Sequence, residues 1–235
     1  MSSLADWYSA NAANILLVPH IMLILYGAVL FSPLGKRVAE ITQNIVKGNR
    51  SQRERMINGM LFSVLGGFTV SSHTYWIHQR ISSQGSSFCS GSGLFSCGDV
   101  IGHETYGYAP IIGIPWGLIG MGVFLVLLYL LLVLKNEPDS LLESKKGKKK
   151  VTRSEAKSKP ELVTMIGLLL TGGGIPVIGL LIYYETQIHK ICQYCSVAHI
   201  ANVILLVMFI VVFSKLKDDD WNSLSINDIG VETNE

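Results

Sequence analysis

Residues 110–134 read PIIGIPWGLIGMGVFLVLLYLLLVL, twenty-five positions without a charged side chain. At a helical rise of 1.5 Å per residue, about 20 apolar residues cross the hydrocarbon core of a bilayer. Four other stretches of similar length and character predict further spans, at 14–32, 57–78, 162–184 and 192–214. The sequence therefore predicts an all-α polytopic membrane protein with five transmembrane helices.

The composition of the whole chain agrees with this class. Of 235 residues, 49% are hydrophobic and 15% are charged, against about 25% charged residues in soluble domains. Disordered tails, collagen-like repeats and coiled coils are excluded, and a soluble enzyme with one large core is disfavoured. We expect membrane lipid and no nucleic acid among the partners.

The positions of the basic residues predict the orientation in the membrane. Seventeen of the 19 Lys and Arg residues lie in the connections 33–56 and 135–161 or after residue 214, and only Arg80 and Lys190 lie in the other connections. The positive-inside rule then places the N-terminus outside and the C-terminus inside a cell membrane. No basic residue precedes the first apolar stretch, so that stretch is expected to be a true span and not a cleavable signal.

The fourth predicted span contains features that disturb a helix. Gly172, Gly173, Gly174 and Pro176 lie near its middle and predict a kink or a break there. Such a break is tolerable in a membrane only where neighbouring helices cover the freed backbone. We expect this glycine run, like Gly66 and Gly67, to permit close approach of helices.

All four cysteines fall on the predicted outer side, where disulfides form and persist. Cys89 and Cys97 lie in the segment 79–109, and Cys192 and Cys195 form a CxxC motif at the start of the last span. A helix start favours the thiolate and so predicts a lowered thiol pKa. Reversible thiol exchange, two structural disulfides, and a zinc site completed by Cys89 and Cys97 or His103 are all compatible with this set. The seven residues between Cys89 and Cys97 suit zinc poorly and, being small and flexible at their start, favour exchange.

Three motifs in this order resemble the vitamin K epoxide reductase family. They are the Cys-x7-Cys loop, the Gly113-Ile114-Pro115 that opens the next span, and the final CxxC. The resemblance covers residues 57–214 and implies a four-helix catalytic core around a bound quinone. Residues 1–56 would add a transmembrane helix and a basic cytoplasmic loop, and residues 215–235 a polar cytoplasmic tail. The chain resembles the microbial type, here without a fused thioredoxin-like domain after the last span.

The resemblance also implies an electron path. Cys89 would exchange with a separate extracytoplasmic thioredoxin-fold thiol oxidase, Cys97 would pass electrons to Cys192, and Cys195 would face the quinone. This path predicts a membrane thiol-disulfide oxidoreductase that reduces a ubiquinone- or menaquinone-type quinone and supports disulfide-bond formation. The alternatives are a vitamin K epoxide or quinone reductase, and a non-enzymatic membrane scaffold with structural disulfides.

The sequence departs from the vertebrate pattern near the expected quinone. His199 stands where vertebrate relatives carry a tyrosine, Trp116 and Gly117 stand near a missing asparagine, and His103 replaces a Ser or Thr. These departures favour ordinary quinone over the epoxide. We expect His199, Trp116 and His73 to contact the quinone, His20 only to pack in the additional span, and Tyr194 to join an aromatic belt at the membrane surface.

Overall fold

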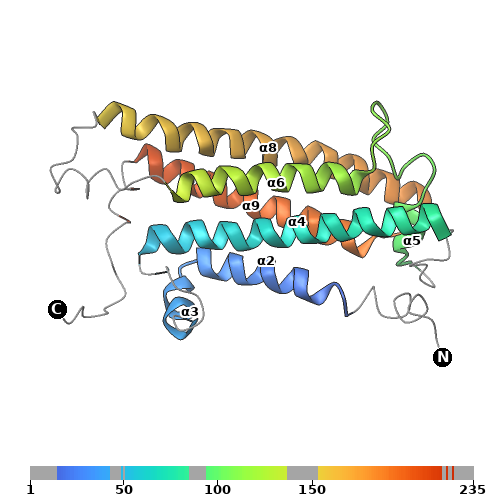
Figure 1. The fold of residues 1–235 in the computed structure, drawn as a ribbon, viewed down its shortest axis with the longest axis horizontal. Helices are drawn as coiled ribbons and strands as arrows, with labels where there is room; N and C mark the ends of the chain where they lie inside the picture. Colours follow the sequence, from blue (N-terminus) through green and yellow to red (C-terminus); the bar gives the residue numbers. More distant parts are fainter. Residues whose placement is uncertain are drawn as a thin grey trace.

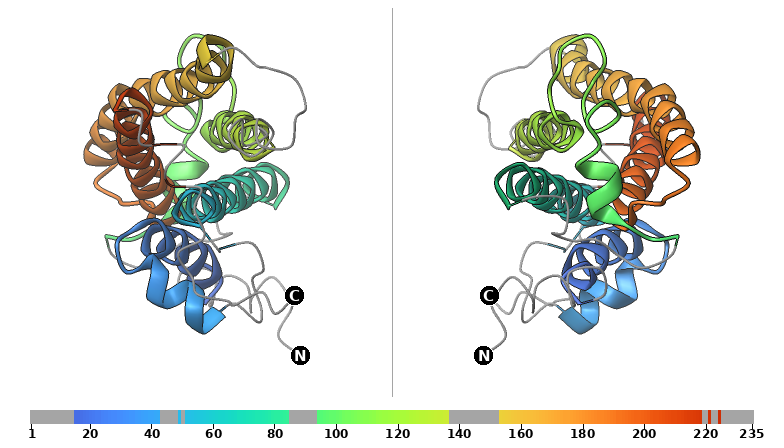
Figure 2. Two further views of the ribbon diagram at one scale, coloured as in Figure 1. Left: turned by 90° about the vertical axis from the view of Figure 1, so that its left-hand side faces the viewer. Right: turned by 90° about the vertical axis from the view of Figure 1, so that its right-hand side faces the viewer.

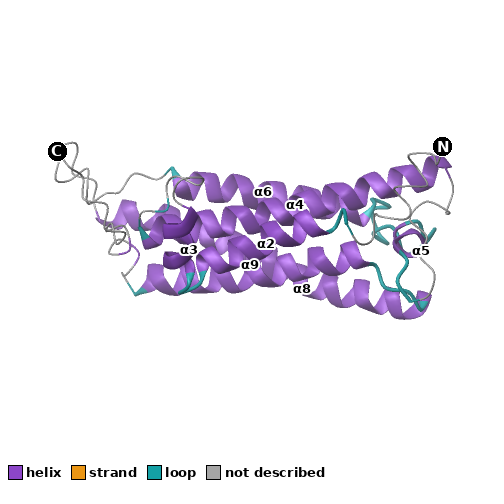
Figure 3. Cartoon of the chain, turned by 90° about the horizontal axis from the view of Figure 1, so that it is seen from below, coloured by secondary structure: helices purple, strands orange, loops and turns teal. Residues whose placement is uncertain are grey.

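The computed structural model describes residues 15–42, 49, 51–84, 94–136, 153–218, 221 and 224. Cys89 and most of the predicted tail lie outside these residues. Seven helices form in the described part of the chain (Figure 1): α2 (Val18–Phe31), α3 (Gly35–Thr42), α4 (Gln52–Gln84), α5 (Cys97–Ile101), α6 (Trp116–Lys135), α8 (Arg153–Ile188) and α9 (Gln193–Lys217). Figure 3 shows no strand among the described residues. The predicted all-α class is confirmed.

The long helices run side by side, and α4 occupies the central position. It contacts α2 on one side and α6 and α9 on the others, as the end-on views show (Figure 2). The short α5 lies at the end of the bundle where α4 and α8 finish and α6 and α9 begin (Figure 1). All five of these elements therefore meet at this end.

The central place of α4 explains its weak apolar character. Ser63, Ser71, Thr74 and His78 on this helix are buried inside the protein, where neighbouring helices rather than lipid surround them. Among the described residues, three helices are long and apolar enough to cross a membrane: α6, residues Lys159–Ile188 of α8, and α9. A fourth candidate span is the pair of α2 and α3, which is bent by 115°. The count of five spans and the orientation stay predictions.

Of the kink or break predicted in the fourth span, the break is wrong, because α8 is one continuous helix that contains Pro176; the kink stays a prediction. The Asn202 side chain of α9 donates a hydrogen bond to the Thr171 carbonyl at 2.9 Å, and Gly174 leaves room for that amide.

Small residues bring the backbones of α2 and α4 into direct contact. A Cβ atom on Gly59 would lie 2.7 Å from the Gly27 carbonyl oxygen and 2.9 Å from the Phe31 nitrogen. One on Gly66 would lie 3.1 Å from the His20 carbonyl oxygen. Glycine is therefore required along this interface, as is usual where membrane helices pack closely.

Candidate functional site

The chain just before Cys97 is tied to the chain just before Cys192. The Ser96 nitrogen donates to the Ile191 carbonyl at 3.2 Å, and the Ile191 nitrogen donates to the Leu94 carbonyl at 2.9 Å. These two backbone bonds make a short parallel bridge. They bring the second loop cysteine against the CxxC motif, although the two lie 95 positions apart in the sequence.

The helix that begins at Cys97 is fixed in turn to α4. The Ser96 hydroxyl caps α5 by accepting from the Asp99 nitrogen at 3.3 Å. The buried His78 of α4 makes a 3.0 Å hydrogen bond through Nδ1 to the Ile101 carbonyl at the other end of α5. Because both ends of α5 are held, the place of Cys97 is fixed by the helix bundle.

The CxxC motif forms the start of α9. Cys192 is the N-cap, and its sulfur accepts a hydrogen bond from the Cys195 nitrogen at 3.2 Å. The Cys192 thiol also makes side-chain hydrogen bonds with Cys195 and with Cys97. Three of the four predicted catalytic cysteines are therefore brought together as thiols, and Cys89 lies outside the described residues.

Burial governs the acidity of Cys192, which lies just ahead of the α9 span. Its side chain is fully buried, and this burial raises the pKa of the thiol well above its ordinary value; the hydrogen bonds with Cys195 and Cys97 act in the same direction. The lowered pKa expected from the helix start is therefore wrong for Cys192. The cost of taking a thiolate out of water exceeds what the helix terminus supplies.

Glu185 of α8 is a site residue that the sequence interpretation missed. Its carboxylate accepts a hydrogen bond from the Cys192 nitrogen at 3.1 Å and interacts electrostatically with Cys97. One signal could have revealed it: Glu185 is the only charged residue between Glu161 and Lys190. A lone carboxylate in a membrane segment is a candidate functional group by default.

A cavity opens beside Cys195 between α4, α5, α6, α8 and α9. Most of its lining is apolar or aromatic, and the residues that border it include Cys195, Trp116, Tyr106, Tyr184 and Glu185. The Trp116 ring nitrogen donates to the Tyr106 carbonyl at 3.1 Å, which fixes the indole at the wall. The apolar and aromatic lining would suit a flat apolar ring. The cavity volume of about 40 Å³ is, however, below the ~300 Å³ typical of small-molecule sites. Side chains must therefore move for a ring to bind.

Of the three predicted quinone contacts, only Trp116 borders this cavity. His199 lies one turn beyond Cys195 on α9, and its contact with quinone stays a prediction, as does that of His73. His73 instead packs in a cluster with His20, Trp76 and Tyr194.

Tyr194, between the two cysteines of the motif, is fully buried and does not belong to an aromatic belt. The spacing of Tyr194, Val197, Ala201 and Leu205, all buried, is the inward stripe of a helix and could have revealed this.

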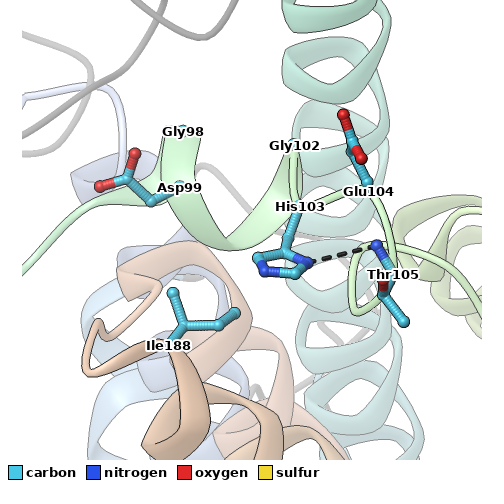
Figure 4. Close-up of a pocket in the computed structure, with 7 residues that line it drawn as sticks. All are labelled: Gly98, Asp99, Gly102, His103, Glu104, Thr105 and Ile188. Carbon is cyan, nitrogen blue, oxygen red and sulfur yellow. Dashed lines mark hydrogen bonds between the residues drawn. The ribbon is translucent and has the colours of Figure 1, made fainter.

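A separate, open hollow of about 360 Å³ lies beside α5 at the end of the bundle that holds the CxxC motif (Figure 4). Gly98, next to Cys97, lines it together with Asp99, His103, Glu104 and Ile188. The Nδ1 atom of His103 accepts hydrogen bonds from the Thr105 and Tyr106 nitrogens at 3.2 and 3.3 Å, so this ring nitrogen shapes a turn. No cluster of three metal-binding side chains occurs within the described ranges.

The comparison with known families agrees with this geometry. The family model described as the vitamin K epoxide reductase family matches residues 59–210, which include the Cys97 helix, the Trp116 helix and the CxxC motif. No curated protein and no solved structure gives a significant match. With about two thirds of its length matched by one family model, the chain belongs to the vitamin K epoxide reductase family.

Proposed function

We propose that this membrane oxidoreductase passes electrons from the thiols of a separate extracytoplasmic thioredoxin-fold protein, through its two cysteine pairs, to quinone. Membership of the family makes the chain a membrane redox protein; the route and the partner are the proposal. The observation that carries it is the backbone bridge between Phe95 and Ile191, which brings Cys97 against Cys192. A cysteine from the loop pair lies against the CxxC pair, as a relay between them requires.

Each step of the proposed relay conserves electrons and protons. The partner's dithiol reduces a Cys89–Cys97 disulfide and is itself oxidised to a disulfide. The Cys97 thiolate attacks Cys192 of a Cys192–Cys195 disulfide, the new Cys97–Cys192 bond forms, and the electron pair of the broken bond stays on the Cys195 sulfur. Cys89 then attacks Cys97, which restores the loop disulfide and leaves Cys192 and Cys195 reduced.

Cys195 borders the apolar cavity and is the sulfur from which electrons leave the protein. A bound quinone supplies an acceptor for two electrons and two protons. Trp116 offers a flat apolar wall for a ring, and its hydrogen bond to Tyr106 holds that wall in one orientation. The burial of Cys192 disfavours its thiolate, so the more accessible Cys195 is the one suited to the last step.

The partner would approach from the outer end of the bundle. The open hollow beside α5 is lined by Gly98, the residue after Cys97, and gives a separate protein room to bind at this end of the bundle. Attack on a disulfide requires access to one of its sulfurs, and Cys192 is too deeply buried to be attacked from outside. We therefore assign partner exchange to the loop pair.

The test is to follow each cysteine during turnover in membranes or detergent micelles. Cys195→Ala should abolish reduction of an added ubiquinone or menaquinone analogue. Cys89→Ala should block electron transfer from a thioredoxin-fold dithiol and leave reduction driven by a small dithiol such as dithiothreitol. Ser214→Ala, on the exposed side of the opposite end of α9, is the matched control and should behave as wild type.

Other outcomes would select the alternatives. Turnover of vitamin K epoxide, with no oxidation of protein thiols, would establish the epoxide reductase. Cysteines whose trapped redox state never changes with quinone would establish the scaffold with structural disulfides. If all four single cysteine variants still oxidise the partner, the relay is wrong.

A further inference from the structure

His20 lies on α2, outside residues 59–210 that match the family, yet it makes two directed hydrogen bonds to the family region. Its Nδ1 atom lies 3.0 Å from the Thr69 hydroxyl oxygen, and its Nε2 atom lies 3.2 Å from Nδ1 of His73. Both partners belong to α4. A packing role alone does not require either bond.

The direction of these bonds follows from the hydroxyl. Thr69 has one hydroxyl hydrogen, which it donates to the Gly66 carbonyl at 3.1 Å, so its oxygen accepts from Nδ1–H of His20. A neutral His20 then has its lone pair on Nε2, and this atom accepts from Nδ1–H of His73. With the Thr69 hydrogen on Gly66, both rings take the Nδ1–H tautomer, an assignment that forms part of the proposal and that the NMR experiment below tests.

The rings of His20 and His73 pack near the CxxC motif because both lie beside the ring of Tyr194. The ring of His73 lies 4.8 Å from the ring of Tyr194, and that of His20 lies 6.4 Å from it, both in edge-on arrangements. Tyr194 stands between Cys192 and Cys195 and is fully buried. His73 also interacts electrostatically with Cys97.

The position of His20 is itself fixed by backbone packing. Gly66, one turn before Thr69, lies close to the His20 carbonyl, because a Cβ atom there would be 3.1 Å from that oxygen. The next turn of α2 packs against the same glycine through Ile24. The additional helix therefore presents His20 to His73 at a defined depth.

We propose that His20 is a positioning residue of the redox centre, supplied by the additional helix. By fixing the tautomer and the orientation of His73, it holds the His73 ring against Tyr194 and so maintains the CxxC turn where Cys97 can reach it. This role rests on the proposed relay for its effect on rate. The tautomers that it requires can be measured without any turnover.

The variants separate the polar link from packing. His20→Leu replaces the imidazole with an apolar side chain of similar bulk and removes both hydrogen bonds. This variant should lower kcat for quinone reduction by about tenfold and leave KM for the dithiol unchanged. His20→Gln keeps an acceptor for His73 and a donor for Thr69, and should recover to within about twofold of wild type. Met22→Ala, on the exposed side of α2 with 61% of its surface accessible, is the control.

The second measurement is ¹⁵N NMR of histidine-labelled protein in micelles. Wild type should show the Nδ1–H tautomer for His20 and His73, and His20→Leu should shift His73 toward the Nε2–H tautomer. If His20→Leu does not fold, Thr69→Val takes its place and should perturb the His20 signal.

Each failure has a distinct meaning. Wild type that never reduces quinone would defeat the proposed function, while the NMR signals would still test the link. Three results would overturn the positioning role. They are a His20→Leu variant as active as wild type, a His20→Gln variant as slow as His20→Leu, and an Nε2–H tautomer at His73 of the wild-type protein.

Discussion

α2 and α8 lie on opposite sides of the bundle (Figure 1), and they are held there by different kinds of contact. α2 meets α4 backbone to backbone: at Gly59 a methyl group would collide with the Gly27 oxygen and the Phe31 nitrogen. α8 meets α9 through side chains, with Gly167 against the Phe209 ring and Gly174 against the Asn202 amide. Backbone atoms cannot move aside as side chains can.

The difference teaches that close backbone contacts are not confined to the family core, where Gly117 of α6 lies equally close to the Tyr75 backbone of α4. α8 belongs to that core, yet it exposes Leu162, Leu169 and Ile182, the face that lipid would cover. α2 lies outside the core and brings His20 to the CxxC motif. An interface between backbones suits a helix whose task is to hold one side chain at a fixed depth.

The largest expected effect is that of Gly59→Ala on the α2–α4 interface. The added methyl group would lie 2.7 Å from the Gly27 oxygen, and neither helix can relieve this by a rotamer change. We expect a loss of about 3 kcal/mol in the free energy of unfolding. Unfolding of the purified protein in mild detergent measures it. A stable variant would show that α2 is loosely held.

A smaller loss is expected for Asn202→Ala at the α8–α9 interface. The change removes the hydrogen bond to the Thr171 carbonyl and leaves a void opposite Gly174. We expect a loss of about 2 kcal/mol, measured by the same unfolding experiment. The neighbouring Val203→Ala, on the exposed face of α9, is the control and should unfold as wild type does. An equal loss in both variants would show that the Asn202 hydrogen bond does not contribute specifically to the packing of α8 on α9.

Much of the fold could be predicted from the sequence because apolar length and spacing are local properties. The stretches predicted at 110–134 and 192–214 became α6 and α9, although α6 begins six residues later than predicted, at Trp116. Pro176 misled the prediction because its cost depends on neighbours. The packing of α9 on that part of α8, including the bond from Asn202, is a tertiary feature that no local pattern contains.

The parts of the candidate site that depend on residue type could be predicted from the sequence, and the parts that depend on packing could not. The CxxC motif and Cys97 could be predicted as reactive groups from residue type and spacing. The rise in the pKa of Cys192 could not be foreseen, since it follows from full burial. Likewise His20 looked like a packing residue, because its partners Thr69 and His73 lie about fifty positions away.

Gly167→Ala tests whether the side chains at the α8–α9 interface can move to accommodate an added methyl group. A methyl group there would lie 2.5 Å from the Cζ atom of Phe209, but the aromatic ring can turn or shift to accommodate it. We expect a loss of about 1 kcal/mol, well below that of Gly59→Ala. Phe209→Leu in the same background should recover part of the loss by making room. Without such recovery, the two interfaces would not differ in the way described.

The smallest effect, and the only gain, is expected for Gly173→Ala on the outer side of α8. A Cβ atom at this position would meet nothing within 4 Å, so alanine introduces no collision. Glycine inside a helix costs conformational entropy, and its replacement by alanine should stabilise the protein by about 0.5 kcal/mol. The unfolding transition in detergent should move upward. A loss comparable to that of Gly167→Ala would mean that another helix or a second copy of the chain covers this face of α8. The contrast with α2 would then reflect a missing neighbour and not a looser contact.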